Sequence, residues 1–137
     1  MGRILALDYG TKRVGIAVTD PLKIIATSLD TIHPDKLINY LKDYFLKEQV
    51  ELIVVGLPTQ MNGQASESET HIIPFIKKLT QQIPTIPVVR YDERFTTKMA
   101  ISSMIEGGYK KKDRQDKKRL DSISATLILQ GYLLSIQ

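Results

Sequence analysis

The sequence predicts an α/β fold in which a mixed β-sheet carries helices on both faces. The order of the elements predicts this class, and two further observations limit the number of domains and the possible chemistry. The first part of the chain contains three consecutive strand-like segments, and the remainder alternates strands and helices, in the order βββαβαβαα. The length of 137 residues suits one domain, which we expect to span residues 1–137. Cysteine is absent, which excludes disulfides, thiol nucleophiles and Cys-ligated metals.

The first three elements are expected to form an antiparallel meander. Residues 3–8 contain four successive apolar residues before an abrupt polar turn, a pattern typical of a buried strand. The next strand is expected at 14–19, and the five-residue link between the two fits a hairpin. The Asp20-Pro21 pair ends this strand, and residues 24–29 fit a third one.

The next elements are expected to alternate. Pro34 suits the first turn of a helix whose apolar residues keep helical spacing as far as Phe45. Residues 51–56 contain a continuous apolar run, which is typical of a strand buried on both faces. Ser66 and Glu69 have the spacing of a capping box and indicate a second helix.

The remainder of the chain completes the pattern. Pro74 predicts a kink or a late start in the second helix, because proline disrupts a helix interior. Residues 86–91 fit another strand, and 96–105 fit a short helix that a glycine pair terminates. Apolar residues at helical spacing over 120–134 predict the last helix.

The positive charge is concentrated in one segment, Lys110 to Arg119. This segment contains seven basic and two acidic residues, a net charge of +5, whereas the whole chain carries +4. Such a cluster is either an electrostatic footprint for phosphates or a solvated loop of mobile lysines. No apolar run approaches the roughly 18 residues of a membrane span, and no secretory signal is visible, so we expect a soluble cytoplasmic protein without a membrane partner.

Acidic residues occur at three places that this topology can bring to one edge of the sheet. Asp8 and the Asp92-Glu93 pair follow strands, and Asp121 lies early in the last helix. Each also has an ordinary structural explanation. Asp8 could cap its own turn, Asp92 or Glu93 could form an ion pair with a neighbouring arginine, and Asp121 could interact with the dipole at a helix N-terminus. Ligand sites in such sheets nevertheless lie beyond the carboxyl ends of parallel strands.

A cluster of carboxylates needs a cation, because like charges otherwise repel. Oxygen-only ligands with open positions favour Mg²⁺ or Mn²⁺. Two such ions would form the two-metal arrangement that hydrolyses phosphodiesters. The residues therefore suggest a metal-dependent phosphodiesterase.

Four segments resemble, in the same order, the motifs of the YqgF/RuvX family of RNase H-like nucleases. They are residues 8–15 (DYGTKRVG), 56–58 (GLP) followed by Asn62-Gly63, 92–97 (DERFTT), and 120–125 (LDSISA) followed by 127–129 (LIL). The resemblance covers essentially the whole chain. It implies an RNase H-like fold, a relation to Holliday-junction resolvases, and pre-16S rRNA nuclease activity in ribosome biogenesis.

The resemblance also implies roles for particular residues. Asp8, Glu93 and Asp121 would be the catalytic, metal-binding carboxylates, with Asp8 as the shared ligand. The related resolvases have a carboxylate after the fourth strand, where this chain has residues 56–58 and no acid, so Glu93 would take its place. The choice between Asp92 and Glu93 stays open at this point.

Basic residues would then bind the nucleic acid. Lys12 and Arg13 lie in the turn beside Asp8, and either contact a flanking phosphate or face solvent. Arg94 either binds a phosphate bidentately or pairs with Asp92. The basic segment would follow the backbone without reading sequence, and its candidate contacts are Lys110, Lys111, Lys112, Lys117 and Lys118.

The sequence leaves open which nucleic acid is bound and whether the protein is an enzyme. The nucleic acid is either an rRNA precursor or branched DNA, and an association with the ribosome would follow from the former. The main alternative to an enzyme is an RNA-binding assembly factor on the same fold. The actin/hexokinase family shares the strand, Asp-x-Gly-Thr turn and strand of residues 4–18, but its second lobe would not fit in 137 residues. The sequence is compatible with a monomer or a homodimer.

Overall fold

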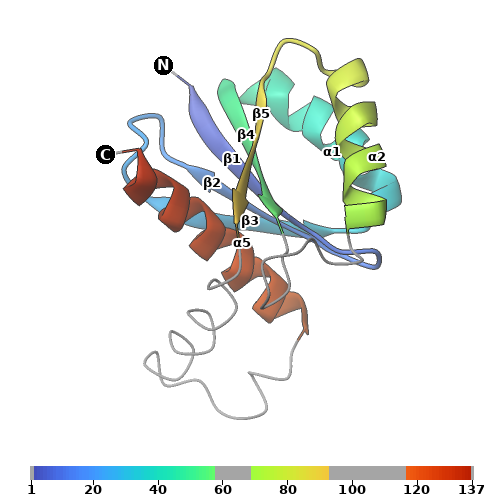
Figure 1. Cartoon of the computed structure of the whole chain (residues 1–137). Helices are drawn as coiled ribbons and strands as arrows, with labels where there is room; N and C mark the ends of the chain where they lie inside the picture. Colours follow the sequence, from blue (N-terminus) through green and yellow to red (C-terminus); the bar gives the residue numbers. More distant parts are fainter. Residues whose placement is uncertain (1, 58–68, 93–116, 137) are drawn as a thin grey trace.

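A computed structural model describes residues 2–57, 69–92 and 117–136, together with the side chains of all of these except residues 117–122. In this part of the chain, five strands form one mixed sheet in the order β3-β2-β1-β4-β5 (Figure 1). The antiparallel pairs are β1 with β2 and β2 with β3, and the parallel pairs are β1 with β4 and β4 with β5. The strands are β1 (Arg3–Tyr9), β2 (Val14–Thr19), β3 (Ala26–Ile32), β4 (Val50–Leu57) and β5 (Val88–Asp92).

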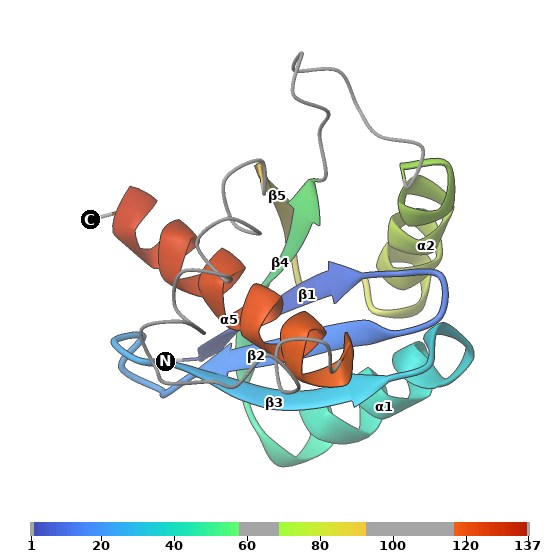
Figure 2. The ribbon, with the colours of Figure 1, turned by 90° about the horizontal axis from the view of Figure 1, so that it is seen from below.

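Helices cover both faces of the sheet, as the sequence predicts. Helices α1 (Pro34–Lys47) and α2 (Glu69–Gln82) lie on one face, and α5 (Lys117–Ser135) crosses the other (Figures 1 and 2). The short helix expected at 96–105 and the capping residue Ser66 lie outside the described residues. The three layers create two separate apolar cores.

The central strand β1 contributes to both cores through the alternation of its side chains. Leu5 and Leu7 pack in the core beneath α1 and α2, whereas Ile4 and Ala6 pack in the core beneath α5. All four are 3% exposed or less. A strand can be apolar at every position in this way only when layers cover both of its faces.

The start of α1 follows from its sequence. Pro34 occupies the first turn, where a missing N–H costs nothing, and the Nδ1 atom of His33 accepts a hydrogen bond from the Asp35 N–H at 3.1 Å. Leu37 and Leu41 then stand one turn apart and are fully buried. Helix α1 is therefore fixed at its N-terminus and along its buried face.

Some expected boundaries differ from the observed ones. The third strand begins at Ala26, because the Asp20 carboxylate accepts hydrogen bonds from the backbone N–H groups of Ile24 and Ile25, both at 2.8 Å, and holds this segment in a turn. Pro74 lies inside α2, which continues through it from Glu69, so the late start is wrong. The last helix begins before residue 120: Lys117 and Lys118, expected in a loop, occupy its first turn.

Arg90 ties the end of β4 to the start of α2. Its guanidinium donates to the Glu69 carboxylate at 3.0 and 2.7 Å, and also to the carbonyl oxygens of Val55 and Gly56 at 3.2 and 2.9 Å. Glu69 is 7% exposed, so its carboxylate is largely removed from water. The pair satisfies a buried charge and two strand-end carbonyls together.

The α5 layer approaches the sheet closely at a glycine. A Cβ atom on Gly131 would lie 2.7 Å from Cζ of Tyr91, and closer still to the Tyr91 hydroxyl. Real Cβ contacts are not this short, so the Tyr91 ring occupies the space that any larger residue at 131 would need. Tyr91 immediately precedes the last residue of β5, so this contact lies between α5 and the end of that strand.

We predict that Arg90→Leu lowers the free energy of unfolding by about 3 kcal/mol, because it leaves the buried Glu69 carboxylate unpaired. The double variant Arg90→Leu/Glu69→Leu should recover most of the loss. Urea unfolding monitored by circular dichroism measures both. Lys23→Gln, which removes an exposed ion pair with Glu51, is the control and should cost less than about 1 kcal/mol. Equal losses of stability for Arg90→Leu and Lys23→Gln would contradict the prediction.

We predict that Gly131→Ala lowers the free energy of unfolding by about 1 kcal/mol, because overpacking against Tyr91 outweighs the gain in helix propensity. In a Tyr91→Leu background the same change should stabilise by about 1 kcal/mol, since only the propensity term remains. A double-mutant cycle in urea measures the coupling. Identical effects in the two backgrounds would show that the close contact has no energetic role.

Candidate active site

The parallel strands end at one edge of the sheet, and the candidate residues Asp8 and Asp92 lie there. Leu7 of β1 is paired with Val55 of β4, and Leu57 of β4 with Asp92 of β5. Asp8 follows Leu7 directly and is paired with Gly15 on the antiparallel side. Asp8 is thus held between two strands at the carboxyl edge, and its side chain is half-buried.

The strand alternation assigns Asp8 and Tyr9 to opposite faces. Ile4 and Ala6 face α5, so Asp8 shares the α5 side of the sheet. Tyr9 packs on the α1–α2 side, where its ring centroid lies 4.7 Å from that of Phe75. The end of β1 therefore presents a carboxylate to one layer and an aromatic ring to the other.

Asp121 lies on the same side of the sheet as Asp8. It is the fifth residue of α5, one turn before Ala125, which is buried against the sheet. Helix α5 begins at the edge where β1 and β3 end, and it runs back across the sheet (Figure 2). The topology thus brings the backbone of Asp121 to the layer that the Asp8 side chain faces.

Small residues allow this helix to lie close to the sheet. Ser124 and Ala125 are both buried, so small side chains lie between this part of the helix and the sheet. Ile128 and Leu129 follow and fill the core beneath α5. The early part of α5 is thereby fixed against the central strands.

Asp92 does not share the face of Asp8. Val89 and Tyr91 pack in the α5 core, whereas Arg90 reaches Glu69 on α2, so alternation gives Asp92 the α2 side. Glu93 and Arg94 lie outside the described residues. The structure therefore separates Asp8 from Asp92, one of the two acids that the sequence left open.

Among the described residues, Arg90 does not form the ion pair that its sequence neighbours suggest. Asp92 and Glu93 were its expected partners, but its guanidinium binds the carboxylate of Glu69, 21 positions earlier. Nothing in the sequence identifies such a distant partner. Arg90 acts on the site through the carbonyls at the end of β4 that it holds.

The basic candidates divide into two groups. Lys12 is exposed and Arg13 half-buried in the turn between β1 and β2, beside Asp8. This turn requires glycine at position 10, because a Cβ there would lie 2.6 Å from the Arg13 carbonyl oxygen. Lys117 and Lys118 begin α5, and their side chains are not described. Lys110, Lys111 and Lys112 lie outside the described residues.

The described side chains alone do not form a metal centre. Among them, no group of three or more His, Cys, Asp or Glu residues could hold an ion. Of the three acids that the motifs single out, only Asp8 has a described side chain. Its carboxylate is a hard oxygen ligand of the type that Mg²⁺ and Mn²⁺ prefer.

Within the described part of the chain, no helix is long and apolar enough to span a membrane.

Comparisons of the sequence with known proteins identify the family of this chain. A family model described as "RuvX: Holliday junction resolvase" matches residues 2–135. A relative from Christiangramia forsetii named "Putative pre-16S rRNA nuclease" is 56% identical over 133 residues, which cover 97% of this chain and 98% of the relative. A protein of the same name from Phocaeicola vulgatus is 54% identical over 135 residues, covering 98% and 97%.

Solved structures support the fold independently. RuvC of Thermus thermophilus in complex with a Holliday junction substrate aligns with a TM-score of 0.57 at 15% identity, covering 98% of this chain and 96% of RuvC. A second structure of Thermus thermophilus RuvC gives 0.55 at 13% identity. The expected RNase H-like fold is thus confirmed, and the length and identity of the sequence matches make this chain a member of the RuvX family of Holliday junction resolvases.

Proposed function

We propose that this protein is a metal-dependent cytoplasmic nuclease that hydrolyses phosphodiester bonds in structured nucleic acid. Precursor 16S rRNA is the favoured substrate, as the names of its relatives suggest, and branched DNA is the other candidate. The observation that carries the proposal is the position of Asp8. It stands at the carboxyl end of the central strand, on the face that α5 covers, in a chain of the RuvX family.

Asp8, Glu93 and Asp121 would hold the metal ions. The α5 side of the sheet supports this set, because Asp8 has that side by alternation and Asp121 belongs to α5 itself. Alternation along β5 gives Asp92 the opposite face of the sheet from Asp8, which favours Glu93 as the metal ligand of the pair. Carboxylate oxygens favour Mg²⁺ or Mn²⁺, and we propose two ions.

Bound metal would supply the hydroxide that attacks the phosphorus and would neutralise the leaving oxygen. The chain's own residues orient the substrate. Lys12 and Arg13 lie beside Asp8 in a turn that Gly10 keeps tight, so they are suited to the phosphate next to the scissile one. Arg94 would bind a further phosphate, and residues 110–119 would follow the backbone through charge alone.

We predict that Asp8→Asn abolishes cleavage while it preserves the fold, because the amide keeps the shape of the carboxylate and removes its charge. Cleavage of a precursor 16S rRNA fragment and of a four-way DNA junction, each with Mg²⁺ and with Mn²⁺, measures the loss. Thermal unfolding checks the fold. Asp43→Asn, which removes an exposed carboxylate from α1, is the control and should retain full activity.

Cleavage by Asp8→Asn at the wild-type rate would refute the assignment of the site. If the wild-type protein cleaves neither substrate but binds RNA equally well with and without Mg²⁺, the chain is an assembly factor rather than an enzyme. If only one of the two substrates is cleaved, the result identifies the class of nucleic acid.

We predict that replacing the five lysines of the basic segment weakens binding to all sequences alike. The slope of log affinity against log salt should fall by up to about 0.7 for each lost contact on a single strand. Glutamine is the suitable replacement because two of the positions are helical, and it keeps helix propensity there. The five positions are Lys110, Lys111, Lys112, Lys117 and Lys118.

A variant with glutamine at Lys36, Lys47 and Lys77, exposed on α1 and α2, is the matched control and should keep the wild-type slope. Fluorescence anisotropy with a labelled RNA at several salt concentrations measures both variants. An unchanged slope in the five-lysine variant would show that the segment is a solvated surface that does not contact the nucleic acid. It would also move the binding surface to Lys12, Arg13 and Arg94.

A further inference from the structure

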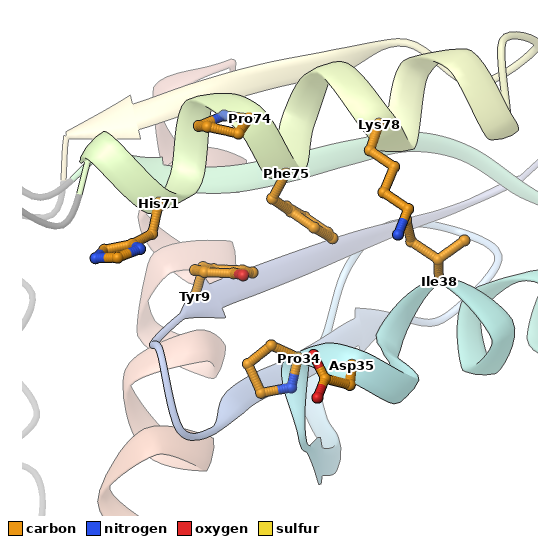
Figure 3. Close-up of a pocket in the computed structure, with 8 residues that line it drawn as sticks. All are labelled: Tyr9, Pro34, Asp35, Ile38, His71, Pro74, Phe75 and Lys78. Carbon is orange, nitrogen blue, oxygen red and sulfur yellow. The ribbon is translucent and has the colours of Figure 1, made fainter.

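A cavity of about 300 Å³ opens between α1 and α2, on the side of the sheet opposite to Asp8 (Figure 3). Tyr9 contributes to its lining from the end of β1, α1 contributes Pro34 and Asp35, and α2 contributes Phe75 and Lys78. The residues come from three elements that are far apart in the sequence. This cavity is not part of the carboxylate site described above, but the residue of β1 that lines it, Tyr9, directly follows Asp8.

The wall of the cavity is formed by flat, apolar groups. The rings of Tyr9 and Phe75 lie 4.7 Å apart with an interplanar angle of 32°, and Tyr9 is only partly covered. Pro34 and Pro74 add two more rings from the flanking helices. Burial first, and the neighbouring Asp35 carboxylate second, raise the pKa of the Tyr9 hydroxyl, so it stays protonated at neutral pH.

Charged groups of both signs stand at the rim. The Asp35 side chain is 90% exposed, and its carboxylate lies 3.7 Å from Nδ1 of the His33 ring. The same Nδ1 atom accepts a hydrogen bond from the Asp35 N–H. Lys78 and His71 line the same cavity from α2. The cavity thus offers an aromatic platform, an acceptor and a cation.

The cavity and the carboxylate site are adjacent because they share the end of β1. Asp8 faces α5 and Tyr9 faces α1 and α2, and the two residues are consecutive. A nucleic-acid strand that crosses this strand end with a phosphate at Asp8 would bring a neighbouring nucleotide to Tyr9. Nucleobases stack on aromatic side chains without regard to sequence, and polar groups at the edge then select among them.

We propose that this cavity binds one unpaired base of the substrate, guanine in preference to the others, beside the phosphate at Asp8. This inference rests on the proposed function for its ligand. The volume of the cavity, at the lower end of the range for small-molecule sites, suits a single base. A base held here must be out of its helix, so the substrate is unpaired next to the cut.

The preference for guanine follows from Asp35. An ionised carboxylate only accepts hydrogen bonds, and guanine presents two adjacent donors, N1–H and the exocyclic amine. Adenine and cytosine present one amine beside an acceptor. Uracil presents one N–H between two carbonyl oxygens, and a carboxylate repels these oxygens. Lys78 supplies the positive charge that a neighbouring phosphate needs.

The test measures binding without metal or cleavage. Pentaribonucleotides of uridine with guanosine, inosine, adenosine or uridine at the centre are titrated, in EDTA, into the full-length protein labelled with ¹⁵N. The guanosine pentamer should shift the backbone amide resonances of Tyr9, Asp35 and His71. It should also bind about tenfold more tightly than the inosine pentamer, which lacks only the exocyclic amine.

Two pairs of variants separate the cavity from the general charge of the surface. Asp35→Asn should make the guanosine and inosine pentamers bind alike, whereas Asp43→Asn, on the same helix but not lining the cavity, should keep the difference. Lys78→Gln should weaken every pentamer, whereas Lys77→Gln should not. Tyr9→Leu should weaken all pentamers roughly tenfold through lost stacking.

The proposal is overturned if the pentamers bind without shifting the resonances of the cavity residues, or if Asp35→Asn leaves the guanosine preference intact. It is also overturned if no pentamer binds at millimolar concentration. These outcomes are independent of the nuclease assignment, because no metal is present and Asp8 is unchanged. Conversely, an Asp8→Asn protein that still cleaves would refute the catalytic site and leave the binding result standing.

Discussion

The structure depends on one constraint, the burial of β1 on both faces. The strand has hydrogen-bonded neighbours on each side, β2 antiparallel and β4 parallel, and a helical layer above and below. Because successive side chains point in opposite directions, every residue of β1 is committed to one layer or the other. A shift of register by one residue would exchange Leu5 and Leu7 with Ile4 and Ala6, and neither core could accept the exchange.

The alternation of side chains continues past the apolar residues of β1 to its polar end. Asp8 belongs to the α5 layer and Tyr9 to the layer of α1 and α2, so a charged and an aromatic group emerge side by side with different surroundings. Arg90 reinforces the edge by binding the carbonyls at the end of β4 and the carboxylate of Glu69. The edge is therefore held in place before any ligand arrives, which keeps the reorganisation needed on binding small.

Much of the fold could be predicted from the sequence, because the decisive signals are local. The apolar run before Asp8 gives the first strand, and Pro34 gives the start of α1. The rule that sites lie beyond parallel strands directs attention to Asp8, and the structure places this residue at that edge of the sheet. The missed boundary of β3 depends on the Asp20 side chain, which ties residues 24 and 25 into a turn, and no pattern of hydrophobicity reports such hydrogen bonds.

Features made by distant residues could not be predicted. The partner of Arg90 is Glu69, although acids stand much nearer in sequence, because the pairing depends on how α2 packs on β4. The space around Tyr91 that restricts position 131 is likewise visible only after α5 has been placed on the sheet. The cavity at Tyr9 draws on three elements, and its lining residues taken singly look like ordinary core and surface residues.

The placement of α5 has a consequence for the order in which the protein assembles. Strands β1, β2 and β3 are neighbours in sequence and can pair locally, whereas α5 begins 108 residues after the end of β1 and 85 residues after the end of β3. Loop closure over such a separation is slow compared with hairpin formation, and on the ribosome α5 is synthesised after the whole sheet. In the metal site proposed above, Asp8 and Glu93 are synthesised before Asp121, which belongs to α5. Under that proposal the nascent chain gains its full set of carboxylates, and with it hydrolytic activity, only when α5 docks on the sheet.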